Sequence, residues 1–324
     1  MRFDLSRARF IAGMAALALC SSTPLASAAD QYPSRSIEWI VMWSAGGGAD
    51  TATRTFTKYL EKELKQTIVV KNVTGGGGAA GYITARQAHP DGYTLVTVQG
   101  DLAKFVPAKL APIKIDDFTS IAGFAVQSPI LLVRADSPWK TLSDFTAAAT
   151  AKPGHLTVGV SDIGGVHHQP IVLWSEAVGI KLRAIAHKGS PQMNAAILGG
   201  HVDAISSYVR PAIPYLKDNT LRPLAYFGPK RPLALPDTPT FKELGFNVVL
   251  NQPYGMGGPA GLPDSVKAVL AKAAAAVNAN PDFQKDLANL GLEPYAVSGK
   301  ELRQDLVDSQ ADITKVMAVL RSEK

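Results

Sequence analysis

The sequence predicts an α/β protein built from two units of similar plan. Short apolar, β-branched segments alternate with segments of helical periodicity along most of the chain, which is typical of parallel sheets with right-handed crossovers. Glycine-rich turns interrupt this alternation in both halves. Apolar residues make up 46% of the 324 residues and charged residues 19%, so the chain is able to bury the cores of about two domains.

The first unit follows the order β-α-β-α-β. Its apolar runs are strand-like because they are short and bounded by glycine or by turn residues such as Pro90-Asp91-Gly92. The expected elements are a strand at 37–43, a helix that opens at Asp50, a strand at 68–73, a helix at 79–88 and a strand at 93–98.

The second unit repeats this rhythm, and the C-terminal part is mostly helical. No low-complexity linker separates the units, so two domains joined by crossing strands are expected, with crossings near 127–130 and 251–254. This places domain 1 at 29–129 plus 253–324 and domain 2 at 130–252. The expected strands are 131–134, 156–160, 182–186, 204–207 and 221–227, and the expected helices are 142–149, 166–178, 191–198, 265–278, 281–290 and 300–320.

Residues 1–28 predict a secretory signal. Three arginines precede an apolar stretch at 10–20, and small residues close the segment at Ala26-Ser27-Ala28. The stretch is shorter than the roughly 20 residues that a membrane-spanning helix needs. We expect cleavage near Ala28 and export to a bacterial periplasm. The alternative is a lipoprotein acylated at Cys20, but Leu19 stands where such signals carry a small residue.

Charge and cysteine content exclude several classes of protein. The formal net charge is +6, and the longest basic run after the signal is Lys230-Arg231. Nucleic-acid binding needs a cluster of phosphate-neutralising side chains, so we expect no nucleic-acid partner. Cys20 is the sole cysteine, which rules out a disulfide scaffold, an iron–sulfur site and a cysteine-based zinc site.

Four predicted strand-to-helix turns have the features of an anion site. They lie at 43–50, 74–79, 161–165 and 188–191. A helix start presents unpaired N–H groups and a partial positive charge, and glycines let a ligand approach the backbone closely. In an open α/β sheet such turns gather at the carboxyl ends of the strands, where ligands bind. Glycine loops also occur because these turns are tight, so both interpretations stay open for each loop.

Individual residues in these turns have two interpretations. Asp50 either caps its helix or contacts a ligand, and Lys188 is either the one cation of the turns or a solvated surface charge. Ser190 is expected to be an N-cap and Pro191 the first helical residue. None of the four turns contains an arginine, so an anionic ligand is expected to be held mainly by neutral donors.

Motifs of enzymes and cofactor sites are missing from the sequence. No P-loop, G-x-S-x-G elbow or H-E-x-x-H motif occurs, and the spacing G-x-G-x-x-G appears inside the glycine run at 76–81. His167 and His168 would point about 100° apart on a helix, which is unsuitable for chelating one metal ion. We expect no cofactor and no metal. An exported α/β hydrolase stays an alternative, because catalytic triads form in space rather than along the sequence.

Short motifs follow one another in a specific order along the mature chain. They are Tyr32-Pro33, 37–41, Gly46-Gly47-Gly48-Ala49-Asp50, 90–95, Lys188-Gly189-Ser190, 199–203, 235–240, 243–245 and 258–263. In this order they resemble the tripartite tricarboxylate transporter substrate-binding proteins, also called the Bug receptor family.

This resemblance implies a periplasmic receptor of the Venus flytrap type, similar to type II binding proteins. Each of its two domains is a sheet flanked by helices, and the cleft between them closes on a small organic acid. The resemblance also implies delivery of that acid to the permease subunits of a membrane transporter, and we expect a monomer. Some members of the family are thought to act in sensing, so a sensing receptor is a second alternative to transport.

The resemblance also implies a set of ligand-binding residues, most of them in the four turns. Backbone amides and waters at the first two loops hold the ligand carboxylate in the family, and the second domain adds side chains. By position the set is Ala45, Gly48, Ala49, Asp50, Gly78 and Ala80 in domain 1, and Ser161, Gly165, His167, Lys188, Ser190 and Asp203 in domain 2.

The entry to the first loop departs from the family pattern. Family members usually have a proline-rich P-F-x-P-G-G segment, whereas this chain has Met42-Trp43-Ser44-Ala45-Gly46. Trp43 either packs under the loop or lines the cleft beside a bulky or aromatic acid.

Overall fold

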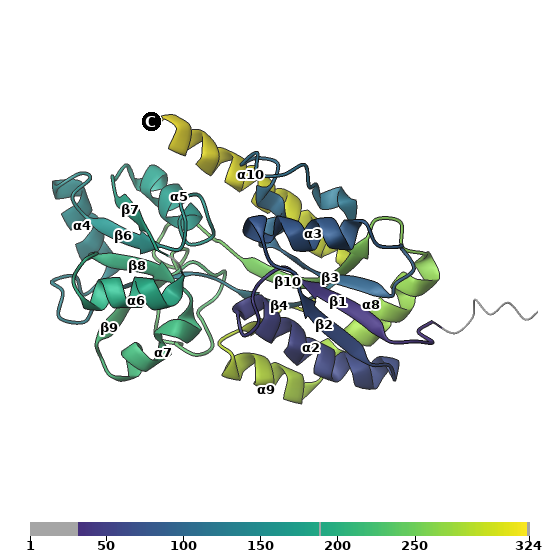
Figure 1. The fold of residues 1–324 in the computed structure, drawn as a ribbon. Coiled ribbons are helices and arrows are strands. Elements are labelled where there is room, and N and C mark those ends of the chain that lie inside the picture. Colours follow the sequence, from purple (N-terminus) through teal and green to yellow (C-terminus); the bar gives the residue numbers. More distant parts are fainter. Residues whose placement is uncertain (1–31, 188, 323–324) are drawn as a thin grey trace, which may run out of the picture.

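The computed structural model describes residues 32–187 and 189–322. The expected signal at 1–28 and Lys188 therefore lie outside the described residues. Two sheets with helices on both faces make up the structure (Figure 1), which confirms the predicted α/β class. Within the described part of the chain, no helix combines the length and the apolar character that crossing a membrane requires.

The first sheet has six strands. They are β1 (Ile37–Val41), β2 (Ile68–Asn72), β3 (Thr94–Gln99), β4 (Phe118–Gln127), β10 (Gln252–Pro259) and β11 (Glu293–Pro294), in the order β11-β4-β10-β3-β1-β2. β1 pairs in parallel with β2 and β3, as the β-α-β-α-β pattern predicts. β10 runs antiparallel to β3 and β4, so the sheet as a whole is mixed.

Helices cover both faces of this sheet (Figure 1). One face carries α2 (Gly48–Leu64), α8 (Asp264–Asn278) and α9 (Pro281–Asn289), and the other carries α3 (Ala79–Arg86) and α10 (Gly299–Ser322). Trp39 of β1 packs against Phe56 of α2, while its neighbour Ile40 belongs to the core on the α3 side. Because both faces are buried, β1 is apolar at nearly every position and not at alternate ones. Short 3₁₀ turns complete this part: η1 (Gly76–Gly78), η2 (Gly100–Lys104) and η3 (Ile115–Asp117).

The second sheet has five strands. They are β5 (Ile130–Arg134), β6 (Thr157–Val160), β7 (Arg183–Ala186), β8 (Ala204–Ser207) and β9 (Leu221–Tyr226), in the order β7-β6-β8-β5-β9. Helices α4 (Leu142–Ala151) and α5 (Gln169–Val178) pack on one face, where Phe145 and Trp174 are fully buried. Helices α6 (Ser190–Leu198) and α7 (Val209–Lys217) pack on the other face.

The chain passes between the sheets twice. The first passage joins β4 to β5 between Gln127 and Ile130, where the sequence predicts a crossing, and the second joins β9 to β10. The Ser128 hydroxyl donates a hydrogen bond of 3.0 Å to Asn251 Oδ1, so the two passages lie side by side. These two segments connect the first sheet to the second.

The sequence pattern does not predict four of the strands and helices: β4, β10, β11 and α7. β10 reads as a turn because glycine and proline make up much of it. The glycines are needed by packing, since a Cβ on Gly255 would lie 2.2 Å from Leu302 Cδ2 of α10 and 3.1 Å from the Ala122 carbonyl oxygen. α7 contains Pro211 and Pro214, which mask its helical periodicity.

Replacing Gly81 of α3 by alanine is expected to lower the free energy of unfolding by about 1–3 kcal/mol. Helix propensity alone favours alanine by about 1 kcal/mol. However, a Cβ at this position would lie 2.7 Å from Met42 Cβ and 2.8 Å from the Val73 carbonyl oxygen. Relieving these contacts requires a shift of the backbone, which costs more free energy than a change of side-chain rotamer. Urea denaturation measures the change, with Thr84→Ala on the exposed side of the same helix as control. An unchanged or raised stability of Gly81→Ala contradicts the prediction.

Candidate ligand-binding site

A cavity of about 950 Å³ lies between the two sheets. Sites for small molecules commonly have volumes of about 300–1,000 Å³. The loop at 43–49 and the ends of β3 and β4 line it from the first sheet, and the segments at 189–191 and 208–211 line it from the second. The passages between the sheets contribute Gln127 and Tyr254, so the cavity sits where both domains and the crossing strands meet.

The start of α2 forms one wall of this cavity. Gly47 is the N-cap residue, and the first hydrogen bond of the helix runs from the Thr51 N–H to the Gly47 carbonyl oxygen over 2.9 Å. The N–H groups of Gly48 and Ala49 precede that bond and have no acceptor inside the helix. Both residues line the cavity. Two backbone donors and the positive end of the helix dipole therefore face the space where a ligand would lie.

Gly48 leaves room for close approach to these donors. A Cβ at this position would lie 3.2 Å from the Tyr254 hydroxyl and 3.5 Å from Gln127 Nε2. Gln127 Nε2 donates a hydrogen bond to the Tyr254 oxygen, which leaves the phenolic hydrogen free to point elsewhere. Burial raises the pKa of the Tyr254 phenol, so it stays protonated at physiological pH. Tyr254 is thus a third donor beside the two amides.

Asp50 holds the first loop in place and does not line the cavity. Its carboxylate is 3% exposed and accepts hydrogen bonds from the Gly46 N–H, Arg54 Nε and Asn72 Nδ2 at 2.8–2.9 Å. The sequence left capping and ligand contact open for this residue. The structure shows neither, because Gly47 is the N-cap residue and the Asp50 oxygens serve the loop and β2.

Trp43 separates the second glycine loop from the cavity. The Trp43 side chain lines the cavity and also packs against both cores of the first sheet. A Cβ on Gly78 would lie 3.7 Å from Trp43 Cζ2, so the indole ring lies directly against that loop. Gly78 and Ala80 do not line the cavity. The prediction that the second loop faces the ligand space is therefore not met in this structure, because the indole ring occupies the side it would face.

The start of α6 forms part of the opposite wall. Gly189, Ser190 and Pro191 line the cavity. Gly189 is the N-cap residue, in a backbone conformation with φ 86° that favours glycine, so the expectation that Ser190 is the N-cap is wrong. Ser190 is instead the first residue of the helix, with its hydroxyl and its N–H at the helix start.

A fifth turn, between β8 and α7, was missed by sequence reasoning. Tyr208 and Arg210 of this turn line the cavity. Arg210 packs against the first domain, since a Cβ on Gly291 would lie 3.0 Å from Arg210 Cβ. The four predicted turns contain no arginine, and Arg210 reaches the cavity wall from this fifth turn. The available signal was the position of Ser206-Ser207-Tyr208 at the carboxyl end of a predicted strand, but the prolines of α7 hid the helix that follows.

His167 is connected to Ser161 and Asp162 by a chain of hydrogen bonds. His167 Nδ1 lies 2.8 Å from Ser161 Oγ, and the Ser161 hydroxyl donates to Asp162 Oδ1 at 2.7 Å. His167 lines the cavity, whereas Ser161 does not. Burial lowers the pKa of His167 to about 4, against a smaller opposing effect of Asp162, so the imidazole is neutral at pH 7. Ser161 is thus a residue that orients His167.

Two further predicted residues lie away from the cavity. Gly165 lies against Asp162, because a Cβ on Gly165 would be 2.0 Å from Asp162 Oδ1. The Gly165 carbonyl oxygen accepts hydrogen bonds from the N–H groups of His168 and Gln169 at the start of α5. Asp203 precedes β8, at the amino end of that strand, and accepts from the Thr157 N–H and hydroxyl at 2.8 and 2.7 Å. The cavity lies at the other end of β8, which removes Asp203 from it.

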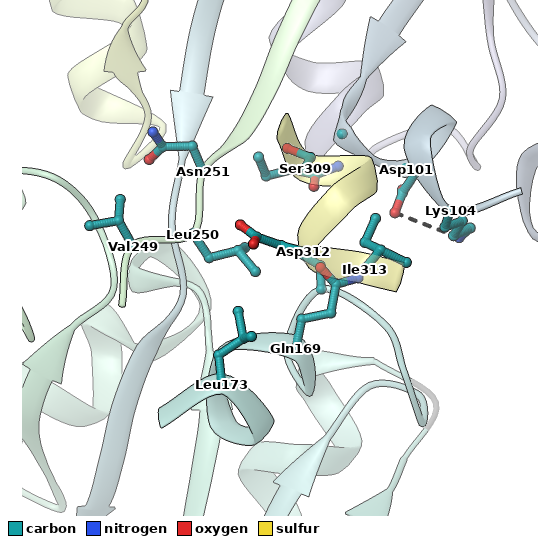
Figure 2. A pocket seen from close by; sticks show the side chains of 13 residues that line it. Asp101, Lys104, Gln169, Leu173, Val249, Leu250, Asn251, Ser309, Asp312 and Ile313 are labelled. Carbon is teal, nitrogen blue, oxygen red and sulfur yellow. Dashed lines mark ion pairs between the residues drawn. The ribbon is translucent and has the colours of Figure 1, made fainter. Parts of the chain in front are cut away.

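Figure 2 shows a second, smaller cavity of about 50 Å³, which shares part of its lining with the large one. It lies between the second passage, α5 and α10, and shares Asp101, Val166 and Gln252 with the wall of the large cavity. Figure 2 shows the ion pair of Asp101 and Lys104, whose Nζ and Oδ1 atoms are 3.6 Å apart, at its edge. In residues 32–187 and 189–322 no group of three or more histidine, cysteine, aspartate or glutamate side chains has the arrangement of a metal site.

Lowering the pH from 7 to 5 is expected to reduce the free energy of unfolding by about 2 kcal/mol for each of His167 and His168. Burial lowers the pKa of both to about 4, below the value of about 6.5 in the unfolded chain. The unfolded chain therefore binds more protons between pH 6.5 and 4, and stability is lost as the pH falls through that window. Urea denaturation at the two pH values measures this loss.

The double variant His167→Asn/His168→Asn is the control for this experiment. Asparagine is able to replace the hydrogen bonds that each Nδ1 makes, to Ser161 Oγ and from the Gly164 N–H, without the titratable ring. The variant is expected to lose less stability than the wild type between pH 7 and 5. Equal losses in both proteins would show that the histidines do not titrate as described.

Comparison with known proteins identifies relatives over nearly the whole chain. The family model described as tripartite tricarboxylate transporter family receptor matches residues 52–320. A Cupriavidus necator protein named UPF0065 protein in gbd 5'region is 32% identical over 305 residues, which cover 94% of this chain and 92% of that protein.

Solved structures share the fold. A TctC solute binding protein from Polaromonas, without ligand, is 28% identical with a TM-score of 0.80, and the match covers 89% of this chain and 99% of that one. MatC from Rhodopseudomonas palustris, solved with bound malate, is 25% identical with a TM-score of 0.72, covering 88% of this chain and all of that one. The family match, together with the fold and the cavity between the sheets, shows that this chain belongs to the tripartite tricarboxylate transporter receptor family.

Proposed function

We propose that this protein is a periplasmic receptor that binds a small organic carboxylate in the cavity between its domains and delivers it to a tripartite tricarboxylate-type transporter. The observation that carries the proposal is the start of α2, where the N–H groups of Gly48 and Ala49 face the cavity without acceptors in the helix. The relative MatC, whose structure contains malate, supports a carboxylate as the class of ligand.

The donors at this wall suit one carboxylate group. A helix start stabilises an anion by about 0.3–1 kcal/mol when exposed and by up to about 2 kcal/mol when partly buried. Hydrogen bonds to a charged group add about 1.5–3 kcal/mol each, and the amides of Gly48 and Ala49 with the hydroxyl of Tyr254 offer three. Such a sum reaches micromolar affinity after the cost of association.

The opposite wall supplies side chains. Ser190 and Arg210 line it, and Arg210 provides a full countercharge for a second anionic group. Trp43, Ala45 and His167 complete the proposed contacts, whereas Asp50, Ser161 and Gly165 act by positioning others. Lys188 stays a prediction, since it lies outside the described residues.

We infer domains at 29–129 plus 253–324 and at 130–252 that move about the two passages as hinges. Contacts between the domains include the hydrogen bond of 3.0 Å from the Tyr226 hydroxyl to Glu293 Oε1 and the packing of α10 near Gly164 of the second domain. Export with cleavage near Ala28, a monomeric state and a transient complex with permease subunits belong to the same proposal.

A hydrolase is disfavoured by the Ser161 geometry. In a catalytic triad the histidine accepts the serine proton and the carboxylate orients the histidine. Here the carboxylate of Asp162 accepts the Ser161 hydroxyl hydrogen directly, so His167 donates to Ser161 instead of activating it. We propose that the protein binds its ligand without chemical change.

Gly48→Val is expected to weaken binding of the native ligand at least 100-fold. The new Cβ would lie 3.2 Å from the Tyr254 hydroxyl, and its methyl groups would cover the two α2 amides. Ala80→Val is the matched control, since it also places valine in the first turn of a helix after a glycine loop but lies outside the cavity. Isothermal calorimetry with the acid released from the purified, denatured protein and identified by mass spectrometry measures both. A Gly48→Val protein that binds like the wild type, or an Ala80→Val protein that fails to bind, contradicts the proposed site.

Ligand binding is expected to reduce the radius of gyration. Closure brings the starts of α6 and α7 toward the start of α2. The ligand stabilises the closed state because it binds this state more tightly than the open one. Small-angle scattering with and without saturating ligand measures the change. The same radius in both samples would count against hinge closure.

A further inference from the structure

Strand β7 forms an outer edge of the second sheet and pairs only with β6, in parallel (Figure 1). The N–H groups of Arg183 and His187 donate hydrogen bonds toward β6 at 2.9 and 2.8 Å. Because successive residues of a strand point to opposite sides in the ladder, the N–H and C=O groups of Ala184 and Ala186 point away from β6. None of the described residues pairs with these four groups. We call them the β7 edge, and such an edge is able to pair with another extended segment.

The other sheet edges are protected. On β2, Glu61 Oε1 accepts a hydrogen bond of 2.6 Å from the outward Ile68 N–H. On β9, the Tyr226 N–H donates to the Pro239 carbonyl oxygen at 2.9 Å. β11 has two residues, one of them a proline, which has no N–H to offer. Of the four edge strands in the part of the chain that the structure describes, β7 is therefore the open one.

A groove of about 1310 Å³ borders the β7 edge. Residues 182–184 and α5 line it from the second domain, and the end of α10 with Ala108 and Lys109 lines it from the first. Its apolar lining includes Ile171 of α5 and Leu320 of α10. In a segment added to β7, every second side chain would point to the sheet face that carries α5 and would enter this groove.

The charges around the groove favour an acidic occupant. Its described lining contains four cations, Lys109, Lys181, Arg183 and Arg321, and one carboxylate, Glu176. All four cations are exposed, and none forms an ion pair with another described residue. Pairing with β7 of a second copy would bring two basic edges together, which like-charge repulsion opposes. A segment with carboxylates would instead be attracted.

We infer that the β7 edge is a docking site for an extended, acidic segment of the transporter's membrane subunits, which adds to the second sheet as a further strand. This inference rests on the proposed function, because it assumes delivery to a transporter. Lysine and arginine are concentrated in the cytoplasmic loops of membrane proteins, so loops on the periplasmic side carry few cations that would oppose this edge. Main-chain hydrogen bonds to Ala184 and Ala186 would hold the segment, and its carboxylates would face Lys181 and Arg183.

Peptide binding tests the chemistry of the occupant. The probe is a labelled, capped octapeptide in which glutamate alternates with valine, and its counterpart has lysine in place of glutamate. In fluorescence anisotropy the acidic peptide is expected to bind at least about 10-fold tighter than the basic one. The double variant Lys181→Glu/Arg183→Glu is expected to reverse this preference. An acidic peptide that binds no tighter than the basic one, or a preference that the double variant leaves unchanged, overturns the inference.

Uptake of the native acid into proteoliposomes that contain the membrane subunits tests the site. Ala184→Pro removes an outward N–H without affecting the hydrogen bonds to β6, and is expected to lower uptake at least about 10-fold while calorimetry shows unchanged affinity for the acid. Val70→Pro is the matched control, because it removes an outward N–H from β2, the edge strand of the other sheet, and uptake is expected to persist.

The outcomes separate the inference from the proposed function. Normal uptake with Ala184→Pro, or an equal loss with Val70→Pro, overturns the inference and leaves the proposed function standing. Absence of uptake with the wild-type protein overturns the proposed function instead. Sedimentation velocity distinguishes the remaining occupant: a wild-type dimer that Ala184→Pro converts to a monomer would assign the β7 edge to a second copy and overturn the inference.

Discussion

The carboxylate of Asp50 fixes the loop on which the binding cavity depends. A buried carboxylate is costly unless hydrogen bonds and a cation compensate for its lost hydration. The three partners of Asp50 are the Gly46 N–H in the loop, Arg54 one turn further along α2, and Asn72 at the end of β2. One side chain therefore ties loop, helix and sheet together. This leaves the amides of Gly48 and Ala49 free toward the cavity instead of turned into the loop.

The crossing strands connect this wall to the segments about which we propose that the domains move. Gln127 ends β4 just before the chain enters the second sheet, and Tyr254 lies on β10 just after it returns. Their hydrogen bond places the Tyr254 hydroxyl beside Gly48. In the hinge closure proposed above, bending at the passages would move the Tyr254 hydroxyl together with the second domain. The proposed ligand contact at Tyr254 and the proposed closure would therefore be coupled through the same short segment.

The sequence predicted the helices and strands that have a recognisable hydrophobic pattern. It missed those whose residues are determined by contacts with parts of the chain that are distant in sequence. The strand at 37–41 was found because it is a short apolar run that ends near glycine, and the helix at 79–86 was found because it follows a glycine loop between two such strands. β10 was missed because it is rich in glycine, which is unusual in a strand. Gly255 is required there since a Cβ would clash with Leu302 of α10, a residue that is distant in sequence. Asp203 was placed at the site by resemblance, yet strand direction puts it at the far end of β8. The signal for Arg210 was limited to its position after the predicted strand at 204–207, because its place in the cavity depends on how α7 packs against the first domain.

The two walls of the cavity differ in the kind of group that recognises the ligand. The α2 wall offers mainly backbone N–H groups, whose position depends on the loop and not on which side chains surround them. The opposite wall and the rim offer the side chains of His167, Tyr208 and Arg210. If the ligand lies in the cavity as proposed, substitutions there are expected to alter which acid fits without disturbing the hydrogen bonds of Asp50. In the proposed site, affinity for a carboxylate comes mainly from the backbone at the start of α2, and the choice among carboxylates comes from a few side chains of the second domain.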